Sequence, residues 1–372
     1  MFSKVIISGD ILRPFLTGSF YQSATKKNIH WLKALLKNSL LKCNMDVSAL
    51  SWDEDLSGND LFFDTPALYQ KLGIPLNREG WARLASSDVV PDVLLESLRE
   101  PLNQALVIGY ELPKVITHAL TMLGTPFIDV FLHPMRFLPD LLFSFRTNVA
   151  EFHQKFKKNV FDSSYIEQQV SLLQAKNAWM SKPAGLTIPA GSAIILEQVS
   201  DDMAVVQNNG RFARLEDHIP RLHQIISEHP SVFIKPHPYT LDKKSISRIT
   251  SAFPVTQLCN TNFYHLMMQP EIEKVIALNS SGLIEAVAFG KEAENLIPFK
   301  FCHAEDFLPE KGEPGSLIPL NDSWLQPQFW RELFDGENRA VAMTRQAIWQ
   351  PNRLRHAMNA DWGYQLISNT VV

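Results

Sequence analysis

The sequence predicts an α/β protein built from two parallel-sheet domains. Short apolar runs that end in polar loops alternate with amphipathic helical segments, and this alternation starts afresh in the second half of the chain. A stretch rich in proline and glycine, residues 181–191, separates the halves and has the composition of a linker. With 372 residues, of which 45% are hydrophobic, the chain is long enough for two cores.

The first half begins with strand and helix patterns in turn. Residues 5–8 form a short apolar run typical of a buried strand, and residues 28–41 have the apolar spacing of a helix that packs on a sheet. Residues 105–109, 113–123 and 127–132 then follow as strand, helix and strand. This order predicts a βαβ unit, and the sequence between residues 152 and 178 predicts one or two surface helices before the linker.

The second half repeats the alternation. Strands are predicted at residues 193–196, 232–235 and 273–278, and helices at residues 222–228 and 283–288. The last stretch contains Trp324, Trp330, Trp349 and Trp362 in mostly helical surroundings. We therefore expect one domain over residues 1–185, a second over 192–322, and a helical tail over 323–372.

Composition and charge exclude several classes of function. The net charge of −4 lacks the basic excess that duplex nucleic acid demands. Three scattered cysteines fit neither a disulfide framework nor a clustered metal site. The N-terminal apolar run is too short for a signal peptide, and no segment approaches the ~20 apolar residues that span a bilayer. We expect a cytoplasmic protein without a transmembrane segment.

Polar residues after the predicted strands are the candidates for a site, because ligands of open α/β sheets bind beyond the carboxyl ends of the strands. Lys235 and His237 follow one strand in the motif KPHP, where a cation and an imidazole could hold a phosphate; a plain turn is the alternative. Ser280 and Ser281 precede a helix whose N-terminus favours an anion, although one serine could simply be its N-cap. Glu285, one turn later, is within reach of a ribose or is an ordinary first-turn acid.

Two further groups contain acids. Gln198, Asp201 and Asp202 lie at the exit of the first strand after the linker, where an acid could act as a nucleophile or a base, or could be merely exposed. In the first half an apolar-flanked cluster holds charged residues that are costly to bury unless paired or functional. Its members are Glu111, Asp129, His133, Arg136 and Asp140, and a structural pair of Arg136 with Asp140 is the alternative.

The chain lacks the GxxxxGK[ST], GxGxxG, HExxH and GxSxG fingerprints. Instead, six segments in order resemble the capsule-polysaccharide type of glycosyltransferase, and more narrowly the bacterial β-Kdo transferases that use CMP-Kdo. They are SGDILRP (8–14), GYELP (109–113), HPMRFLPDLLFSFRTN (133–148), QVSDD (198–202), KPHP (235–238) and NSSGLIEAVAFGK (279–291). The HP and SS pairs are shared with other CMP-sugar transferases, whereas the ordered set is more specific.

The resemblance implies a glycosyltransferase-B-like (GT-B-like) fold of two Rossmann-like domains facing a cleft. It implies that the first domain holds the acceptor and catalytic groups, that residues 192–322 bind the CMP-sugar, and that C-terminal helices return to the first domain. His237, Ser280 and Ser281 would contact the donor phosphate and cytidine, with Lys235 nearby and Glu285 on the ribose.

A retaining transfer through a carboxylate nucleophile is also implied, and the motif gives that role to Asp202, with Asp201 as the competing candidate. Ser200 stands where relatives often have an acid. We expect Glu111 to act as the base that deprotonates the acceptor. Arg136 and His133 would hold the Kdo carboxylate or the acceptor, with Gln198 also at the substrate.

The expected partners are the CMP-sugar donor and a bacterial surface-glycan acceptor, lipid-linked in our interpretation. No metal and no cofactor beyond the donor substrate are expected, because His237, Lys235 and the helix N-terminus can balance the leaving CMP. Any membrane association would be peripheral, at the inner face of the cytoplasmic membrane. A sialyltransferase-like enzyme, a sugar-nucleotide epimerase or hydrolase, and a non-catalytic module of a polysaccharide-assembly complex remain the alternatives.

Overall fold

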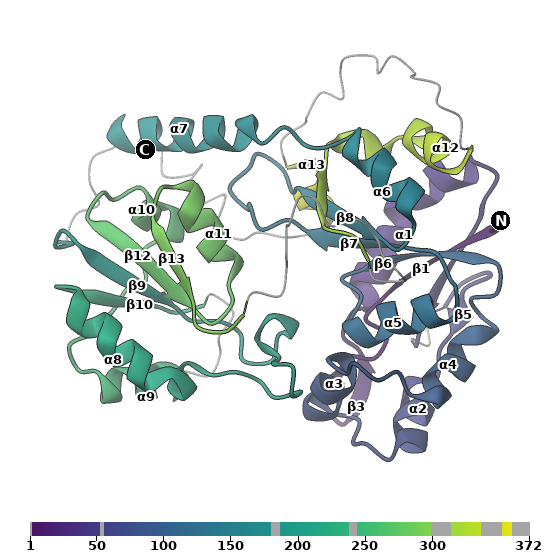
Figure 1. Ribbon diagram of the computed structural model, residues 1–372, viewed down its shortest axis with the longest axis horizontal. Helices are drawn as coiled ribbons and strands as arrows, with labels where there is room; N and C mark the ends of the chain where they lie inside the picture. Colours follow the sequence, from purple (N-terminus) through teal and green to yellow (C-terminus); the bar gives the residue numbers. More distant parts are fainter. Residues whose placement is uncertain are drawn as a thin grey trace.

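Two α/β domains lie side by side, each built on its own sheet (Figure 1). The computed structural model describes residues 2–52, 56–179, 187–237, 244–298, 314–335 and 352–358. Most of the predicted linker, and most of the predicted tail with Trp349 and Trp362, lie outside the described residues.

The first sheet has seven strands. In spatial order they are β14 (Ile318–Leu320), β8 (Phe143–Thr147), β7 (Phe127–Leu132), β6 (Ala105–Tyr110), β1 (Lys4–Gly9), β4 (Asp46–Ser51) and β5 (Leu61–Phe62). The strands from β7 to β5 are parallel, and β8 and β14 extend the edge in antiparallel pairing. Numbered along the chain, the five parallel strands lie in the Rossmann order 3-2-1-4-5, with a topological switch point between β1 and β6.

Helices cover this sheet because each buries its apolar face in the core of the domain. In α1 (Lys26–Leu41), the positions Ile29, Leu32, Leu36 and Leu40 are fully buried, as the spacing predicted. The other helices of this domain are α2 (Thr65–Leu72), α3 (Arg78–Ala85), α4 (Asp92–Arg99), α5 (Lys114–Met122), α6 (Ala150–Lys157) and α12 (Pro327–Asp335). Between β1 and α1 the chain forms a separate hairpin, β2 (Pro14–Thr17) and β3 (Phe20–Ser23).

The second sheet has five strands, all parallel. Their order is β11 (Gln257–Leu258), β10 (Val232–Lys235), β9 (Ser192–Leu196), β12 (Ile272–Ala277) and β13 (Glu292–Asn295), which is again 3-2-1-4-5 along the chain. Its helices are α8 (Ile219–Glu228), α9 (Lys244–Ala252), α10 (Phe263–Met267) and α11 (Ser281–Ala288). The switch point of this domain lies between β9 and β12.

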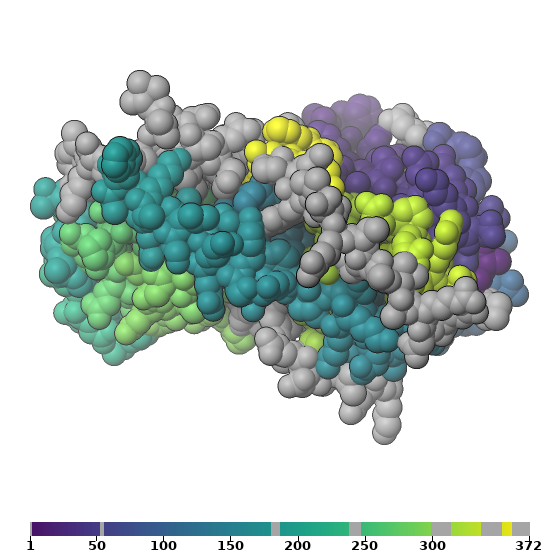
Figure 2. All heavy atoms as spheres, turned by 90° about the horizontal axis from the view of Figure 1, so that it is seen from above, coloured from purple at the N-terminus to yellow at the C-terminus, as the bar shows by residue number. Residues whose placement is uncertain are grey.

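Three segments pack on, or pair with, a domain other than the one whose predicted residue range contains them. α7 (Ser164–Trp179) belongs to residues 1–185, but its Val170 packs into the core of the second domain (Figure 2 shows α7 running over that lobe). β14 belongs to residues 192–322, but it pairs with β8 of the first sheet. The loop at residues 134–142 also packs on the second domain, because its apolar side chains meet Tyr264 and Phe289.

The architecture is the predicted α/β, GT-B-like fold: two Rossmann-like domains and C-terminal helices, α12 and α13 (Arg353–Met358), that return to the first domain (Figure 1). Each strand and helix predicted within the described residues is present. No helix in those residues is both long enough and apolar enough to cross a bilayer.

Candidate functional site

One cavity of about 970 Å³ opens between the two domains. It is lined by the loops that follow β1 and β6 in the first domain and β9 and β12 in the second. These four strands flank the two switch points, so the site lies where the topology of each domain favours ligand binding.

Most of the predicted site residues meet at this cavity. Its walls include Glu111, His133, Arg136, Gln198, Asp202, His237, Ser280 and Ser281. Asp201, Lys235 and Glu285 are not among the lining residues. The sequence motifs therefore converge in space, with three exceptions whose contacts are given below.

Glu111 occupies a constrained elbow after β6. Its backbone has φ +49°, a left-handed conformation that costs a non-glycine residue about 1–2 kcal/mol. Leu112 N–H donates to Asp129 Oδ1 at 2.9 Å, and Glu111 N–H donates to the carbonyl of Val130 at 3.0 Å. A Cβ at Gly109 would lie 2.3 Å from Leu112 Cγ, so glycine is needed for the chain to fold back here.

The buried Asp129 is itself held by an arginine. Arg146 donates to Asp129 Oδ2 from Nε at 3.0 Å and from Nη2 at 2.8 Å, a bidentate pair. Asp129 is fully buried, and burial raises its pKa to about 6 against the lowering effect of Arg146. The pair thus anchors the elbow that presents Glu111 to the cavity.

The Glu111 carboxyl is poised near neutral pH. Glu111 is exposed to the cavity, but the protein around its carboxyl withdraws it from bulk water and raises its pKa to about 7; the charge of Asp202 raises it further, and Arg136 opposes the change. Glu111 belongs to the first domain and Asp202 to the second, so the two acids face one another across the cleft. A carboxyl with this pKa can accept and release a proton at physiological pH.

Asp202 and Asp201 differ in their surroundings. The Asp202 side chain is 54% exposed and lines the cavity, with its Oδ1 3.9 Å from Arg13 Nη1. Asp201 uses its backbone carbonyl to accept from Arg13 Nη2 at 2.9 Å. Arg13 also lies over the Trp81 ring at 4.5 Å, so it fixes this loop against the first domain.

The N-terminus of α11 opens into the cavity. Ser280 is its N-cap, and the Ser280 Oγ accepts from Gly282 N–H at 3.2 Å, which confirms the capping alternative for this serine. Ser281 is the first residue of the helix and lines the cavity. Capping and anion binding are compatible here: Gly282 and Leu283 N–H donate to the Ser280 hydroxyl and carbonyl, which leaves the Ser281 N–H and hydroxyl for an anion.

Gln198 is committed to the protein backbone. Its Nε2 donates to the carbonyl of Asn279 at 2.7 Å, and its Oε1 accepts from Asn279 N–H at 2.7 Å. It therefore ties the loop after β9 to the loop after β12, across the switch point. Its contact with substrate stays a prediction, because Gln198 also lines the cavity and its amide keeps a second N–H and a second lone pair.

His237 and Lys235 diverge after β10. His237 lines the cavity, and burial lowers its pKa, opposed by the charge of Asp202. Its backbone N–H donates to Glu197 Oε2 at 3.2 Å. Lys235 Nζ donates to the carbonyl of Thr261 at 2.7 Å, away from the lining residues, so it supports the strand exit rather than the cavity wall.

Glu285 joins the two domains. Its Oε1 accepts from Arg136 N–H at 2.7 Å and from the Tyr264 hydroxyl at 2.9 Å. Burial raises its pKa to about 7, and the Arg136 N–H lowers it in part. This buried position differs from the predicted contact with a nucleotide ribose, because a donor of the first domain occupies the carboxylate.

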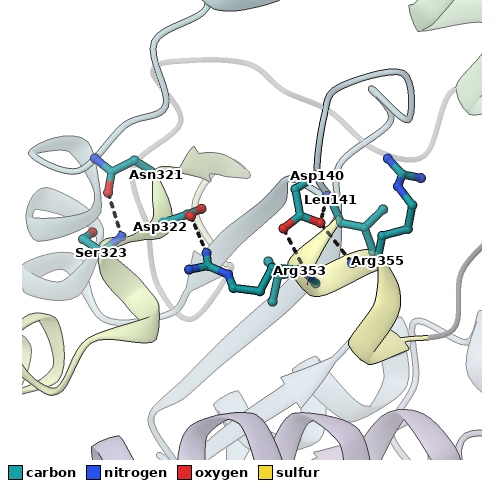
Figure 3. A network of polar contacts seen from close by, with 8 residues as sticks. Asp140, Leu141, Asn321, Asp322, Ser323, Arg353 and Arg355 are labelled. Atoms are coloured by element: carbon teal, nitrogen blue, oxygen red, sulfur yellow. Dashed lines mark hydrogen bonds and ion pairs between the residues drawn. The ribbon is translucent and has the colours of Figure 1, made fainter. Parts of the chain in front are cut away.

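The alternative pair of Arg136 with Asp140 is wrong. Asp140 accepts from the N–H groups of Leu141, Leu354 and Arg355, the last two from α13 (Figure 3). Arg355 in turn donates through Nη2 to the carbonyls of Arg136 and Leu138 at 3.0 Å each. The returning α13 thus fixes the loop that carries Arg136 and His133 to the cavity.

The lining residues that were not assigned a role from the sequence include Asp10, Arg13 and Asn279. Asp10 follows β1 and accepts from Trp81 Nε1 at 2.7 Å; burial raises its pKa to about 6. Asn279 Nδ2 donates to the carbonyl of Ala204, and its buried Oδ1 has no hydrogen-bond partner among the described residues. The available signal was position, since Asp10 and Asn279 come directly after apolar strands.

Within the described residues, no group of three or more His, Cys, Asp or Glu side chains is arranged to hold a metal ion. Carboxylates, an imidazole and a helix N-terminus line the cavity instead. Such a set can bind an anionic ligand and move a proton.

No protein-family model and no curated protein matches the chain. Among solved structures, the KpsC β-Kdo 2,7-transferase of Thermosulfurimonas dismutans is 11% identical, and the match covers 67% of this chain and 91% of that one with a TM-score of 0.32. The KpsC β-Kdo 2,4-transferase of the same organism is 12% identical over 79% of each chain, with a TM-score of 0.36. The spinosyn forosaminyltransferase SpnP is 11% identical, covering 99% and 95%, with a TM-score of 0.23. TM-scores this low carry no information about the chemistry of the site.

Proposed function

We propose that this protein is a retaining glycosyltransferase that moves Kdo from CMP-Kdo to a bacterial surface-glycan acceptor. The observation that supports it best is the meeting of Glu111 and Asp202, from opposite domains, at one cavity between two Rossmann switch points. The choice of donor rests on the resemblance of the ordered motifs to β-Kdo transferases.

In the first step, a carboxylate oxygen of Asp202 attacks the anomeric carbon of Kdo. The bond from that carbon to the CMP phosphate oxygen breaks, its electron pair stays on the phosphate, and a covalent Kdo–Asp202 ester forms. Asp202 is favoured over Asp201 because only Asp202 lines the cavity. Arg13, 3.9 Å from Asp202 in the structure, orients the attacking carboxylate.

In the second step, an acceptor hydroxyl attacks the same carbon and releases Asp202. Glu111 takes the proton of that hydroxyl. Each of the two steps inverts the configuration at the anomeric carbon, so the overall reaction retains it. The pKa of about 7 suits this transfer, because the carboxyl is partly ionised at neutral pH and is still basic. Arg136 and His133 hold the Kdo carboxylate or the acceptor in this scheme.

The CMP moiety binds in the second domain. The hydroxyl and backbone N–H of Ser281, at the start of α11, and the His237 imidazole donate to the phosphate. Asn279 Oδ1 is placed to accept from a hydroxyl or amino group of the nucleoside. The scheme assigns no step to a metal ion, and Lys235 and Glu285 act by supporting the walls of the site.

The test is incubation of the purified protein with CMP-Kdo, and separately with CMP-sialic acid, followed by CMP release and intact protein mass. We expect CMP release and a mass gain of one Kdo unit only with CMP-Kdo. The Glu111→Gln variant should accumulate this adduct in the presence of acceptor, since its second step lacks the base. The Asp202→Asn variant should form none.

Asp201→Asn is the matched control, because it removes a neighbouring carboxylate that does not line the cavity. It should retain turnover; if Asp201→Asn abolishes the adduct while Asp202→Asn keeps it, the nucleophile is misassigned. Reaction with CMP-sialic acid alone would show that the donor is CMP-sialic acid and not CMP-Kdo. Steady CMP release without transfer to any glycan would indicate a hydrolase, and no reaction with either donor would defeat the proposal.

A further inference from the structure

The β2–β3 hairpin is exposed and apolar on both of its faces. In its antiparallel register Phe15 pairs with Gln22 and Thr17 with Phe20, so Phe15 and Phe20 share one face. Leu16 pairs with Tyr21 on the other. All four large side chains are exposed, with Phe20 at 78% and Leu16 at 54%. Exposed apolar residues gathered on one element indicate an interaction surface.

Charge around the hairpin is one-sided. Residues 14–25 contain no charged side chain, and residues 11–45, which add α1, contain six lysines and arginines and no acid. The whole chain, by contrast, has a net charge of −4. Of these cations, Lys27 is exposed on the first turn of α1, next to the base of the hairpin, whereas Lys37 and Lys42 are exposed at the opposite end of that helix, beside α12. The segment that follows the hairpin is therefore basic, which suits an anionic partner.

The hairpin is also attached directly to the cavity. Arg13 precedes it and Ala24 and Thr25 follow it, and all three line the cavity wall. Ala24 N–H donates to the carbonyl of Arg13 at 2.9 Å, which closes the base of the hairpin. Whatever the hairpin touches is thus held at the mouth of the site.

We propose that the hairpin inserts its tip into the surface layer of an anionic lipid bilayer. An apolar medium can surround both faces at once, whereas a glycan or a flat protein surface would cover one face and leave the other exposed. Lys26 and Lys27, which directly follow the hairpin at the start of α1, then lie on the side of the headgroups and contribute to attraction by anionic lipid. Such docking places the cavity at the membrane surface, where a lipid-linked acceptor is found.

The experiment is flotation of the purified full chain with vesicles, without donor or acceptor, so its result does not depend on the proposed reaction. Vesicles of phosphatidylethanolamine and phosphatidylglycerol are compared with vesicles of phosphatidylcholine. We expect the wild-type protein to float mainly with the anionic vesicles. The Leu16→Ser/Phe20→Ser variant should lose about tenfold or more in vesicle affinity, because it withdraws two large apolar side chains from the lipid.

Leu258→Ser is the matched control, since Leu258 is 56% exposed on β11 of the second domain, close to the value for Leu16. It should float like the wild type. Unchanged thermal unfolding of the double variant shows that it is folded, as expected for exposed positions. The proposal is overturned if the wild type stays with neither vesicle type, or if the double variant floats as well as the wild type.

Two other occupants have distinct outcomes. If the hairpin joins two copies of this chain, sedimentation velocity without lipid shows a wild-type dimer that the double variant loses. If it holds the glycan itself, the double variant raises the KM for a soluble, lipid-free acceptor and leaves flotation unchanged. Either result overturns the bilayer proposal.

Discussion

Replacing Glu111 by glutamine should stabilise the protein at alkaline pH while it destroys the proposed base. The ordinary pKa of 4.5 and the folded-state value of about 7 differ by an amount worth about 3.4 kcal/mol at full ionisation. Because the side chain is open to cavity water, we expect about half of this, roughly 1.5 kcal/mol, to appear as stability. Glutamine keeps the size of the side chain and the left-handed backbone, so strain is unchanged.

The sign follows from the raised pKa. The folded protein binds this proton more tightly than the unfolded chain, so the cost of ionising Glu111 is absent below about pH 4.5, grows up to about pH 7 and is complete above it. Thermal unfolding should therefore show the variant about 3–6 °C more stable at pH 8, and about 1 °C or less more stable at pH 5. Glu96→Gln, at an exposed position on α4, controls for the loss of one surface acid.

The same variant should lose about a hundredfold or more in transfer rate. A variant that is no more stable at pH 8, or equally stabilised at both pH values, would refute the account of the Glu111 carboxyl as a group held near neutral pH by burial. Full activity in such a variant would remove Glu111 from the mechanism while leaving the stability argument intact.

Three further predictions concern the surroundings of the site. Gly109→Ala places a methyl group 2.3 Å from Leu112, so we expect a loss of about 1–3 kcal/mol in unfolding free energy and a fall in transfer rate. Adding Leu112→Ala should relieve both effects in part, and additive effects of the two substitutions would contradict this prediction. Arg355→Met leaves the carbonyls of Arg136 and Leu138 without the Arg355 donor, so we expect the free energy of unfolding to fall by about 2–4 kcal/mol. Amide hydrogen exchange in residues 133–142 should become faster, and unaltered exchange there would show that α13 does not fix the loop. Glu294 has its pKa lowered to about 2 by Arg221 and then Lys274, so Glu294→Gln should cost about 1 kcal/mol at pH 7 and progressively less as the pH falls toward 2, as thermal unfolding at pH 7 and pH 3 would reveal.

The convergence of the site was predictable from local pattern. Glu111, Asp202 and Ser281 each follow an apolar strand, and the carboxyl ends of parallel strands share one edge of a sheet. The same rule points to Asp10 after β1, which the motifs left without a role. A short-range signal was sufficient here because each residue and its strand are neighbours in the sequence.

Roles fixed by distant contacts were not predictable in this way. Glu285 is a first-turn acid by its local sequence, and only its contact with Arg136, 149 positions earlier, removes it from the cavity wall. The strand β4 was missed because its buried face includes Ser48 and Ser51, which lower its apolar character although both are enclosed. Burial of small polar residues depends on the neighbouring strands, which the segment itself does not reveal.

The return of β14 to the first sheet affects how the chain folds during synthesis. The outer edge of β8 is paired only after residues 318–320 have left the ribosome, about 170 positions after β8 itself and after the whole second sheet. At about 5–20 residues per second, that edge stays open for roughly 10–30 s. An open strand edge is a template for pairing with other chains, so nascent protein should be most prone to aggregation in this interval. A chaperone that shields strand edges would therefore increase the yield of folded protein most during synthesis of the second domain.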